Sequence, residues 1–232
     1  MAKTYTVDPG RKPSGNIILY WFATLYFRLI GWKVIGHLPP DRKMIVTAGP
    51  HTANLDGWLM VMTAWALRIQ LKWMVKAELT RGPLGFLVRA AGGVGIDRKA
   101  SYNTVDQVIN AFNEADDLLL AVAPEGTRRK LDHWKTGFYW MADGADVPIF
   151  IARLDYGRKV VNLSHPPVHT TGDIDADMQI IFDAYSDVTA KHPEKVSEMR
   201  LRRSARRNNS SRTQDDVPAP APTPPHVEAP DK

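Results

Sequence analysis

The stretch MIVTAGPHTANLDGWLM (44–60) joins a short apolar run to a polar segment that leads into a second, helix-like pattern. The run 44–48 is nearly continuous in apolar residues, which is typical of strands buried on both faces of a parallel sheet. The residues from 57 to 68 suit a helix. A strand, a polar connection and a helix in succession form the repeating unit of α/β proteins.

The same succession recurs along the chain. Further short apolar runs predict strands at 71–75, 118–123 and 148–154. Helical spacing of apolar residues predicts helices at 83–91, 102–115 and 136–145, and one more from Met178 to Val188. Because strands and helices alternate, the sequence predicts an α/β fold with a largely parallel central sheet flanked by helices.

The composition excludes several classes of protein. A chain of 232 residues with 44% hydrophobic residues is long and apolar enough to bury a core, so global disorder is excluded. The absence of cysteine excludes disulfides, a cysteine nucleophile and thiolate metal sites. There is no G-x-S-x-G elbow, no Walker A loop and no G-x-G-x-x-G motif. Prolines between His165 and His169 disfavour the helix that would pair them as metal ligands, so no metal site is expected.

Charge and composition divide the chain into regions. The stretch 200–232 carries seven basic and four acidic residues, and so holds +3 of the net charge of +5. The remaining body is nearly neutral, which does not indicate a nucleic-acid-binding protein. We expect a flexible start at 1–15, an N-terminal aromatic-rich helix at 16–35, a globular body at 36–199 and a disordered basic, Pro-rich tail at 200–232.

The segment NIILYWFATLYFRLIGW (16–32) has two interpretations. Its uninterrupted apolar part is too short to cross a bilayer, because 11 residues of helix from 17 to 27 span about 16 Å of the roughly 30 Å required. Helical spacing gathers its polar side chains in one stripe, made of Asn16, Tyr20, Thr24 and Arg28. The segment is either a helix packed against the body or an amphipathic anchor lying in the membrane surface. Its excess of Trp, Tyr and Phe favours the anchor.

His51 and Asp56 lie five residues apart in the connection that follows the run 44–48. A histidine titrating near neutrality can accept a proton from a hydroxyl group, and a carboxylate on its other ring nitrogen stabilises the imidazolium. The carboxyl end of a parallel strand is where α/β proteins place such chemistry. The alternative is structural, since Asn54 or Asp56 could cap the following helix.

Three further stretches could contribute to a site. The segment GGVGIDRK (92–99) combines glycines with Arg98, whose guanidinium suits phosphate. The segment APEGTRRK (123–130) places one acidic and two basic side chains after a predicted strand, although Pro-Glu-Gly-Thr is also a good turn. The segment VPIFIARLDYGRK (147–159) brings Arg153 and Asp155 to the same edge, and by itself indicates only core.

Together and in this order, the four stretches resemble the lysophospholipid-type glycerolipid acyltransferases, typified by the 1-acyl-sn-glycerol-3-phosphate acyltransferases. That family has an H-x-x-x-x-D block, a glycine-containing block ending in I-D-R, an E-G-T-R block and a V-P-I strand. The corresponding residues here are His51 with Asp56, Gly93–Arg98, Glu125–Arg128 and Val147–Ile149. The plausible match of fold covers about 40–190.

The resemblance implies transfer of a fatty acyl group from acyl-CoA or acyl carrier protein to a hydroxyl group, without an acyl-enzyme and without a cofactor. It makes His51 the general base and Asp56 its orienting partner. It also implies a membrane surface and a lipid acceptor as partners, no nucleic acid, and a peripheral, monotopic location on the cytoplasmic face of the membrane. Acceptor binding would involve Lys76, Gly93, Asp97, Arg98, Glu125, Gly126, Thr127 and Arg128.

The acceptor is less closely specified than the chemistry. Lysophosphatidate is the acceptor that the resemblance favours, but four positions depart from residues frequent in the family, namely Pro50, Ala53, Gly95 and Ala123. The alternatives are another amphiphilic alcohol, such as an ornithine lipid or a glycolipid, and a lipid-binding protein without activity. A hydrolase is disfavoured, because water would have to compete with the acceptor in an apolar cleft.

Overall fold

The computed structural model describes residues 5–7, 13–90, 92–96 and 104–202. Their strands form one sheet in the order β1-β2-β8-β7-β3-β6-β4-β5. The strands are β1 (Tyr5–Val7), β2 (Lys33–Leu38), β3 (Lys43–Gly49), β4 (Leu71–Lys76), β5 (Gly93–Ile96), β6 (Leu118–Val122), β7 (Ile149–Asp155) and β8 (Val160–Leu163). All pairings between these strands are parallel except that of β7 with β8. The α/β fold with a largely parallel sheet is therefore confirmed.

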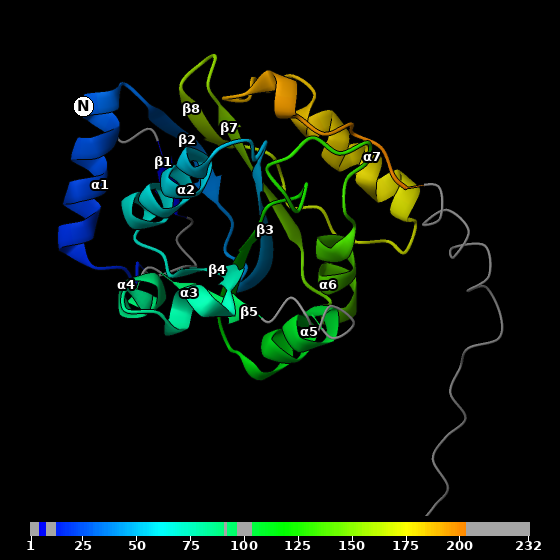
Figure 1. Cartoon of the computed structure of the whole chain (residues 1–232), viewed down its shortest axis with the longest axis horizontal. Coiled ribbons are helices and arrows are strands. Elements are labelled where there is room, and N and C mark those ends of the chain that lie inside the picture. Colours follow the sequence, from blue (N-terminus) through cyan, green and yellow to red (C-terminus); the bar gives the residue numbers. More distant parts are fainter. Residues whose placement is uncertain (1–4, 8–12, 91, 97–103, 203–232) are drawn as a thin grey trace, which may run out of the picture.

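Helices cover both faces of this sheet (Figure 1). They are α1 (Ile17–Ile30), α2 (Asn54–Leu67), α3 (Ala77–Arg81), α4 (Gly85–Ala90), α5 (Thr104–Glu114), α6 (Gly137–Ala145) and α7 (Ile174–Tyr185), with a short 3₁₀ turn at Pro193–Lys195. One core lies between the sheet and α2, with α1 outside α2, and a second lies between the sheet and α5, α6 and α7. Strand β3 serves both cores, since Met44 and Val46 face the first and Ile45 the second.

The predicted elements are found with shifted ends. Strands expected at 44–48, 71–75, 118–123 and 148–154 are β3, β4, β6 and β7. The sequence missed β1, β2, β5, β8 and α3, which are short or lie toward an edge of the sheet. Strand β1 lies in the stretch 1–15 that was expected to be flexible, and it pairs with β2. Helix α1 ends at Ile30, so the expected helix 16–35 is too long.

The end of α1 has a local cause. The Asn16 side chain accepts a hydrogen bond of 2.8 Å from the Ile18 N–H and caps the start of the helix. Gly31 has a φ of 71°, the left-handed conformation in which glycine ends helices. The chain then enters β2 at Lys33. Most of the expected tail lies outside the described residues, but Arg200 belongs to the folded part, where its carbonyl accepts a hydrogen bond from Trp134.

Candidate active site

The connections that follow β3, β6 and β7 meet at one edge of the sheet. These strands are neighbours and parallel, so their carboxyl ends lie side by side. They deliver His51, Glu125 and Tyr156 respectively. Side chains from three distant parts of the sequence therefore gather where parallel sheets place their ligand sites.

The His51 ring faces Asp56 across the start of α2. The Nδ1 atom of His51 lies 3.6 Å from Oδ2 of Asp56, which is a charge contact and longer than a hydrogen bond. Asp56 is fully buried, whereas about a quarter of the His51 side chain is exposed. Because Nδ1 faces the carboxylate, the Nε2 atom of the ring is left for a substrate hydroxyl group.

Asp56 is held by hydrogen bonds on both of its oxygens. Oδ2 accepts from the backbone N–H groups of Thr52 at 2.6 Å and Ala53 at 2.7 Å, and Oδ1 accepts from the Tyr156 hydroxyl at 2.6 Å. The bond from Ala53 is one half of a capping box, because α2 begins at Asn54. The two interpretations of Asp56 are therefore compatible: it caps the helix and also faces His51.

Glu125 connects the E-G-T-R segment to the histidine. Its Oε2 accepts a hydrogen bond of 2.7 Å from the His51 N–H, while Oε1 is buried without a hydrogen-bond partner. Only 1% of the residue is exposed. Burial raises the pKa of Glu125 to about 7, helped by the nearby charge of Asp56 and opposed by the bond from His51. Near neutral pH this carboxyl group can accept a hydrogen bond or donate one.

Burial, more than the neighbouring charges, keeps His51 available as a base. Burial lowers the pKa of His51 below its ordinary value of 6.5, the charge of Asp56 raises it, and Arg128 lowers it further. A lowered pKa leaves the ring neutral at pH 7, which is the form that accepts a proton.

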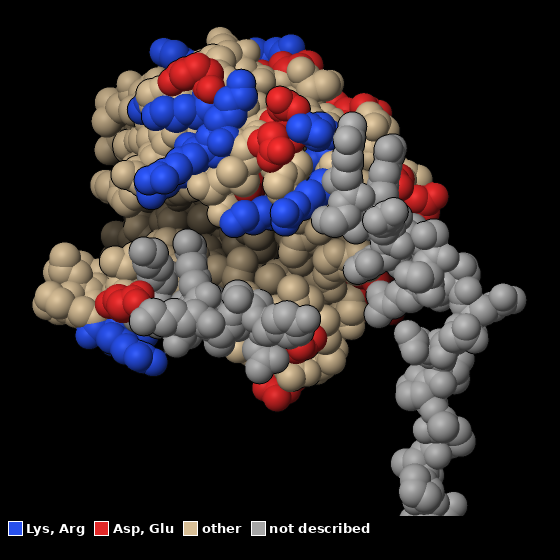
Figure 2. Space-filling model, turned by 45° about the vertical axis from the view of Figure 1, so that its right-hand side comes forward, with Lys and Arg blue, Asp and Glu red and all other residues tan. Residues whose placement is uncertain are grey.

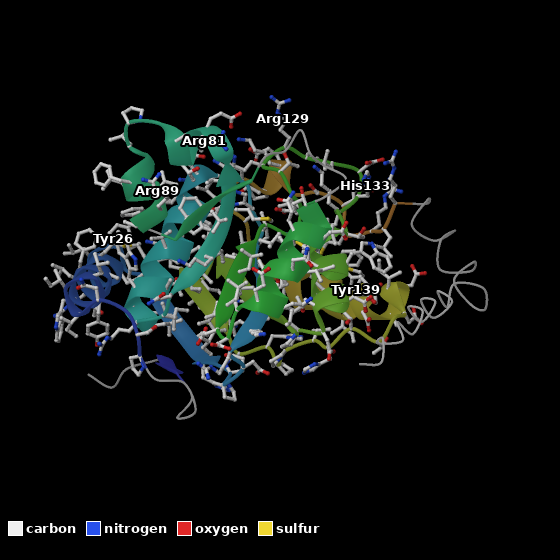
Figure 3. All side chains as sticks on the ribbon, turned by 90° about the horizontal axis from the view of Figure 1, so that it is seen from below. Tyr26, Arg81, Arg89, Arg129, His133 and Tyr139 are labelled. Carbon is white, nitrogen blue, oxygen red and sulfur yellow. The ribbon has the colours of Figure 1, made fainter. Side chains whose placement is uncertain are left out.

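The remainder of the E-G-T-R segment is open to solvent. Gly126 has a φ of 66°, and Arg128, Arg129 and Lys130 are exposed. Figure 3 shows Arg129 and Arg81 projecting on the same side of the molecule. The far end of the loop is tied to the C-terminal part of the fold, where Leu131 donates a hydrogen bond of 3.1 Å to the Ser197 hydroxyl.

The other predicted site residues are only partly placed. Asp97 and Arg98 lie outside the described residues. Lys76 ends β4 and Gly93 begins β5, which pairs with β4. A Cβ atom on Gly93 would lie 2.6 Å from the Val88 side chain and 2.8 Å from its carbonyl oxygen. Gly93 therefore has a packing role in the structure, whatever it does for an acceptor.

Sequence reasoning did not identify two residues that lie next to the His51–Asp56 pair. Tyr156 belongs to the fourth stretch, 147–159, in which the sequence indicated Arg153 and Asp155. Those two side chains form ion pairs elsewhere, Arg153 with Asp187 and Asp155 with Arg158. The N–H of His192 donates a hydrogen bond of 3.2 Å to the Thr52 hydroxyl, next to His51. No sequence signal marks either contact, because both depend on how distant connections pack.

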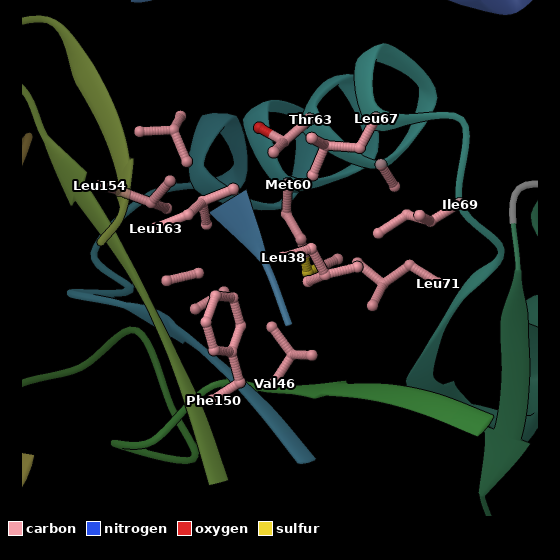
Figure 4. A pocket seen from close by; sticks show the side chains of 14 residues that line it. Leu38, Val46, Met60, Thr63, Leu67, Ile69, Leu71, Phe150, Leu154 and Leu163 are labelled. Atoms are coloured by element: carbon pink, nitrogen blue, oxygen red, sulfur yellow. The ribbon is translucent and has the colours of Figure 1, made fainter. Parts of the chain in front are cut away.

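An apolar cavity of about 30 Å³ lies beneath α2, against the first core (Figure 4). Met60, Thr63 and Leu67 line it from the helix, and Val46 and Phe150 from the sheet. Within the described residues, no group of three His, Asp or Glu side chains is arranged to hold a metal ion. The site thus combines a partly exposed histidine, a buried carboxylate and a nearby guanidinium, with an apolar cavity beneath the helix that follows.

Comparisons with known proteins agree with this arrangement. A family model described as Acyltransferase matches residues 33–152, about half of the chain. The crystal structure of the 1-acyl-sn-glycerophosphate (LPA) acyltransferase PlsC from Thermotoga maritima shares the fold, with a TM-score of 0.52 and 18% sequence identity over 71% of this chain and 74% of that one. No curated protein matches the chain at a significant level.

Proposed function

The chain belongs to the acyltransferase family and is an O-acyltransferase, and we propose that it moves a fatty acyl group from acyl-CoA or acyl carrier protein to a lysophospholipid, with lysophosphatidate as the first choice. The observation that carries this proposal is the contact between the partly exposed His51 ring and the buried Asp56, in which Nδ1 is the nitrogen that faces the carboxylate. The Thermotoga maritima protein is a 1-acyl-sn-glycerophosphate acyltransferase, which supports the choice of acceptor.

In the proposed reaction His51 acts as general base. Its Nε2 takes the proton from the acceptor hydroxyl as the oxygen attacks the thioester carbonyl carbon. The tetrahedral intermediate then collapses, the carbon–sulfur bond breaks, and the thiolate leaves with the proton that His51 returns. Asp56 stabilises the imidazolium between these steps, because its charge favours the protonated ring.

The segment after β6 would hold the acceptor. Arg128 is an exposed guanidinium close enough to influence His51, and guanidinium groups bind phosphate through paired hydrogen bonds. Glu125 is only 1% exposed, so it would act on the acceptor through the hydrogen bond that it accepts from the His51 N–H and not by direct contact. Figure 2 shows a recess in one face of the molecule with Lys and Arg side chains above it, as binding of an anionic substrate would require.

The apolar cavity beneath α2 supports an acyl group as the second ligand. Its lining is almost entirely aliphatic and aromatic, and one of the lining residues is Ala48, three positions before His51. At about 30 Å³ it is too small for a fatty chain as it stands. We therefore expect the donor to widen the contact between α2 and the sheet.

The experiment that tests this function mixes the protein with labelled palmitoyl-CoA or palmitoyl-acyl carrier protein and a panel of acceptors. The panel contains lysophosphatidate, other lysophospholipids, a lyso-ornithine lipid and a glycolipid, and products are identified by mass. We expect phosphatidate as the main product, and no product from a His51→Ala variant. Absence of acylated product from the whole panel, or equal product from the variant, would contradict the proposal.

We also propose that the protein binds membrane surfaces through α1. The side chains of Ile18, Trp21, Leu25 and Leu29 form an outer face of this helix and are each more than half exposed. Leu84 and Phe86, from the segment around the start of α4, are also exposed. An exposed face of this kind suits a helix lying at the lipid interface. No helix among the described residues is long and apolar enough to span a bilayer.

Vesicle co-sedimentation tests this surface. The double variant Trp21→Ser/Leu25→Ser should lose most of its binding to phosphatidylcholine–phosphatidylglycerol vesicles, because it removes two interfacial side chains from the outer face of α1. The control Ile180→Ser removes an exposed apolar side chain from α7, on the opposite side of the sheet, and should bind as the parent does. Equal binding by parent, double variant and control would exclude α1 as the membrane contact.

A further inference from the structure

The Tyr156 hydroxyl donates a hydrogen bond of 2.6 Å to Oδ1 of Asp56, on the carboxylate that faces His51. The two residues are 100 positions apart in the chain. Tyr156 follows directly after β7, and Asp56 lies in the first turn of α2. The bond therefore joins the edge of the sheet to the helix that carries Asp56.

This bond fixes the rotation of the carboxylate. Oδ2 is directed toward Nδ1 of His51 and toward the backbone N–H groups of Thr52 and Ala53. In a residue with no exposed surface, Oδ1 would be left buried without its donor if the hydroxyl were removed. The carboxylate would then gain by turning, and Oδ2 would move away from the histidine ring.

Tyr156 is itself held in place. Its ring meets Trp32, which follows α1, edge to face, with centroids 4.8 Å apart and an interplanar angle of 83°. Its backbone N–H donates a hydrogen bond of 2.9 Å to the Thr189 carbonyl. Burial and then the bond to Asp56 raise the pKa of Tyr156, so that the hydroxyl stays protonated and remains a donor. A fixed ring with a permanent donor can define the orientation of its partner.

We propose that Tyr156 is a positioning residue for the reaction, which holds Asp56 in the rotamer that orients His51. It makes no contact with the reacting atoms and acts through the carboxylate. The proposal rests on the proposed function, because positioning affects turnover only if His51 is the base. It extends the pair recognised in the sequence to a chain of three side chains, from Tyr156 through Asp56 to His51.

The first test is Tyr156→Phe, which keeps the ring against Trp32 and removes the hydroxyl. With palmitoyl-CoA and lysophosphatidate we expect kcat to fall about tenfold, the size of one hydrogen bond to a charged group, while KM for both substrates changes little. The matched control is Tyr139→Phe. It breaks another tyrosine–aspartate bond, of 2.9 Å to Asp177, on the α6 and α7 side of the molecule (Figure 3).

The control separates positioning from stability. Both tyrosine variants should unfold at a lower temperature than the parent, but only Tyr156→Phe should lose turnover per folded molecule. In a second step the variants Asp56→Asn and Tyr156→Phe are combined. If Tyr156 acts through the carboxylate, Tyr156→Phe should cost little in the Asp56→Asn background, because coupled residues are not additive. A full tenfold loss there would overturn the proposal.

A third measurement does not depend on turnover. Histidine-labelled protein is titrated by NMR, and the pKa of His51 is compared in parent, Tyr156→Phe and Tyr139→Phe. Without the hydroxyl donor the carboxylate turns away from the ring, so the charge of Asp56 raises the His51 pKa less, and that pKa should fall in Tyr156→Phe alone. The other groups around His51 are Glu125, Arg128 and, through its backbone, His192, and none of them is altered.

The outcomes are distinguishable. If the parent transfers no acyl group, the proposed function fails, and the NMR titration still decides whether Tyr156 acts on His51 through Asp56. If the parent is active but Tyr156→Phe matches it in kcat and in the His51 pKa, the positioning role is wrong and the function stands.

Discussion

The connection after β3 and the connection after β6 end at the same sheet edge but are built differently. The first, from Pro50 to Ala53, is short, and Glu125 and Asp56 accept hydrogen bonds from its N–H groups. The second, from Ala123 to Thr136, is long and leaves Arg128–Lys130 exposed. A proton transfer needs fixed atoms, whereas binding a mobile lipid head group needs accessible charge. Under the proposed function, the first connection would therefore carry the chemistry and the second the binding of the acceptor.

The largest expected effect tests the chemical role of the first connection. His51→Ala should lower kcat by about 10²–10⁴, the usual contribution of a positioned general base, with the fold intact. The measurement is steady-state turnover together with circular dichroism. The control is His133→Ala, which removes a histidine paired with Asp132 in the second connection and should retain turnover. Equal losses in the two variants would remove the distinction between the connections.

The next prediction concerns Glu125, which belongs to the second connection and reaches into the first. In the folded chain its pKa is about 7, whereas the ordinary pKa of a glutamate side chain is 4.5. Between these values the folded state holds a proton that the unfolded state has released, so this group makes stability fall as pH rises from about 5 to 7. Glu125→Gln should remove this pH-dependent decrease in the free energy of unfolding, which is on the order of 3 kcal/mol.

Urea unfolding of parent and variant at pH 5, 6, 7 and 8 measures the difference. His51 contributes with the opposite sign, since its pKa is lowered, and its contribution largely cancels when the two proteins are compared. The control Glu114→Gln changes an exposed carboxylate at the end of α5 and should follow the parent. If the difference in unfolding free energy between parent and variant stays the same from pH 5 to 8, Glu125 is ionised throughout that range.

The third prediction tests binding by the second connection. Arg128→Ala should raise KM for lysophosphatidate about ten- to a hundredfold, because a paired guanidinium–phosphate contact is lost, and should leave the acyl donor's KM nearly unchanged. Arg128→Lys should restore only part of the affinity, because an ammonium group keeps the charge and loses the fork. Arg129→Ala is the neighbouring control. An unchanged acceptor KM in Arg128→Ala would favour a neutral amphiphilic alcohol as acceptor.

The smallest effect compares two glycines, Gly126 within the second connection and Gly137 directly after it. Gly126 has a φ of 66°, and a Cβ atom there would lie 2.7 Å from the Lys135 side chain. Gly126→Ala should therefore lower stability by about 1–2 kcal/mol through backbone strain. Gly137 begins α6 with open space around a new Cβ atom, so Gly137→Ala should raise stability by about 0.5–1 kcal/mol. Thermal unfolding checks both, and a shared sign would contradict the assigned backbone states.

The predicted strands and helices were recovered where burial constrains the sequence strongly. Strands β3, β6 and β7 lie in the middle of the sheet and are buried on both faces, so they require continuous apolar runs. Only Val34 and Leu38 are buried among the six residues of β2, and β5 consists largely of glycine and valine. Neither produces a continuous apolar run, so their pairing comes from the neighbours available at the sheet edges.

Helix α1 shows the same limit on one face. The sequence predicted a polar stripe that includes Tyr20 and Thr24, yet Tyr20 is buried with Ala23 and Phe27 against the body. The side that faces away from the body is largely apolar, with Trp21 and Leu29 exposed. Helical periodicity defines which side chains share a face, but the partner helix α2 decides which face is covered.

The sequence by itself determined the alternating elements, the acyltransferase blocks and the proximity of His51 to Asp56. The two residues are only five positions apart in the chain, so their side chains cannot lie far from each other. The pair therefore follows from local geometry. Only the tertiary structure decided that Glu125, 74 residues from His51, and Tyr156, 100 residues from Asp56, complete the site. Those contacts depend on the order of parallel strands in the sheet, because strand order sets which distant connections meet at the carboxyl edge.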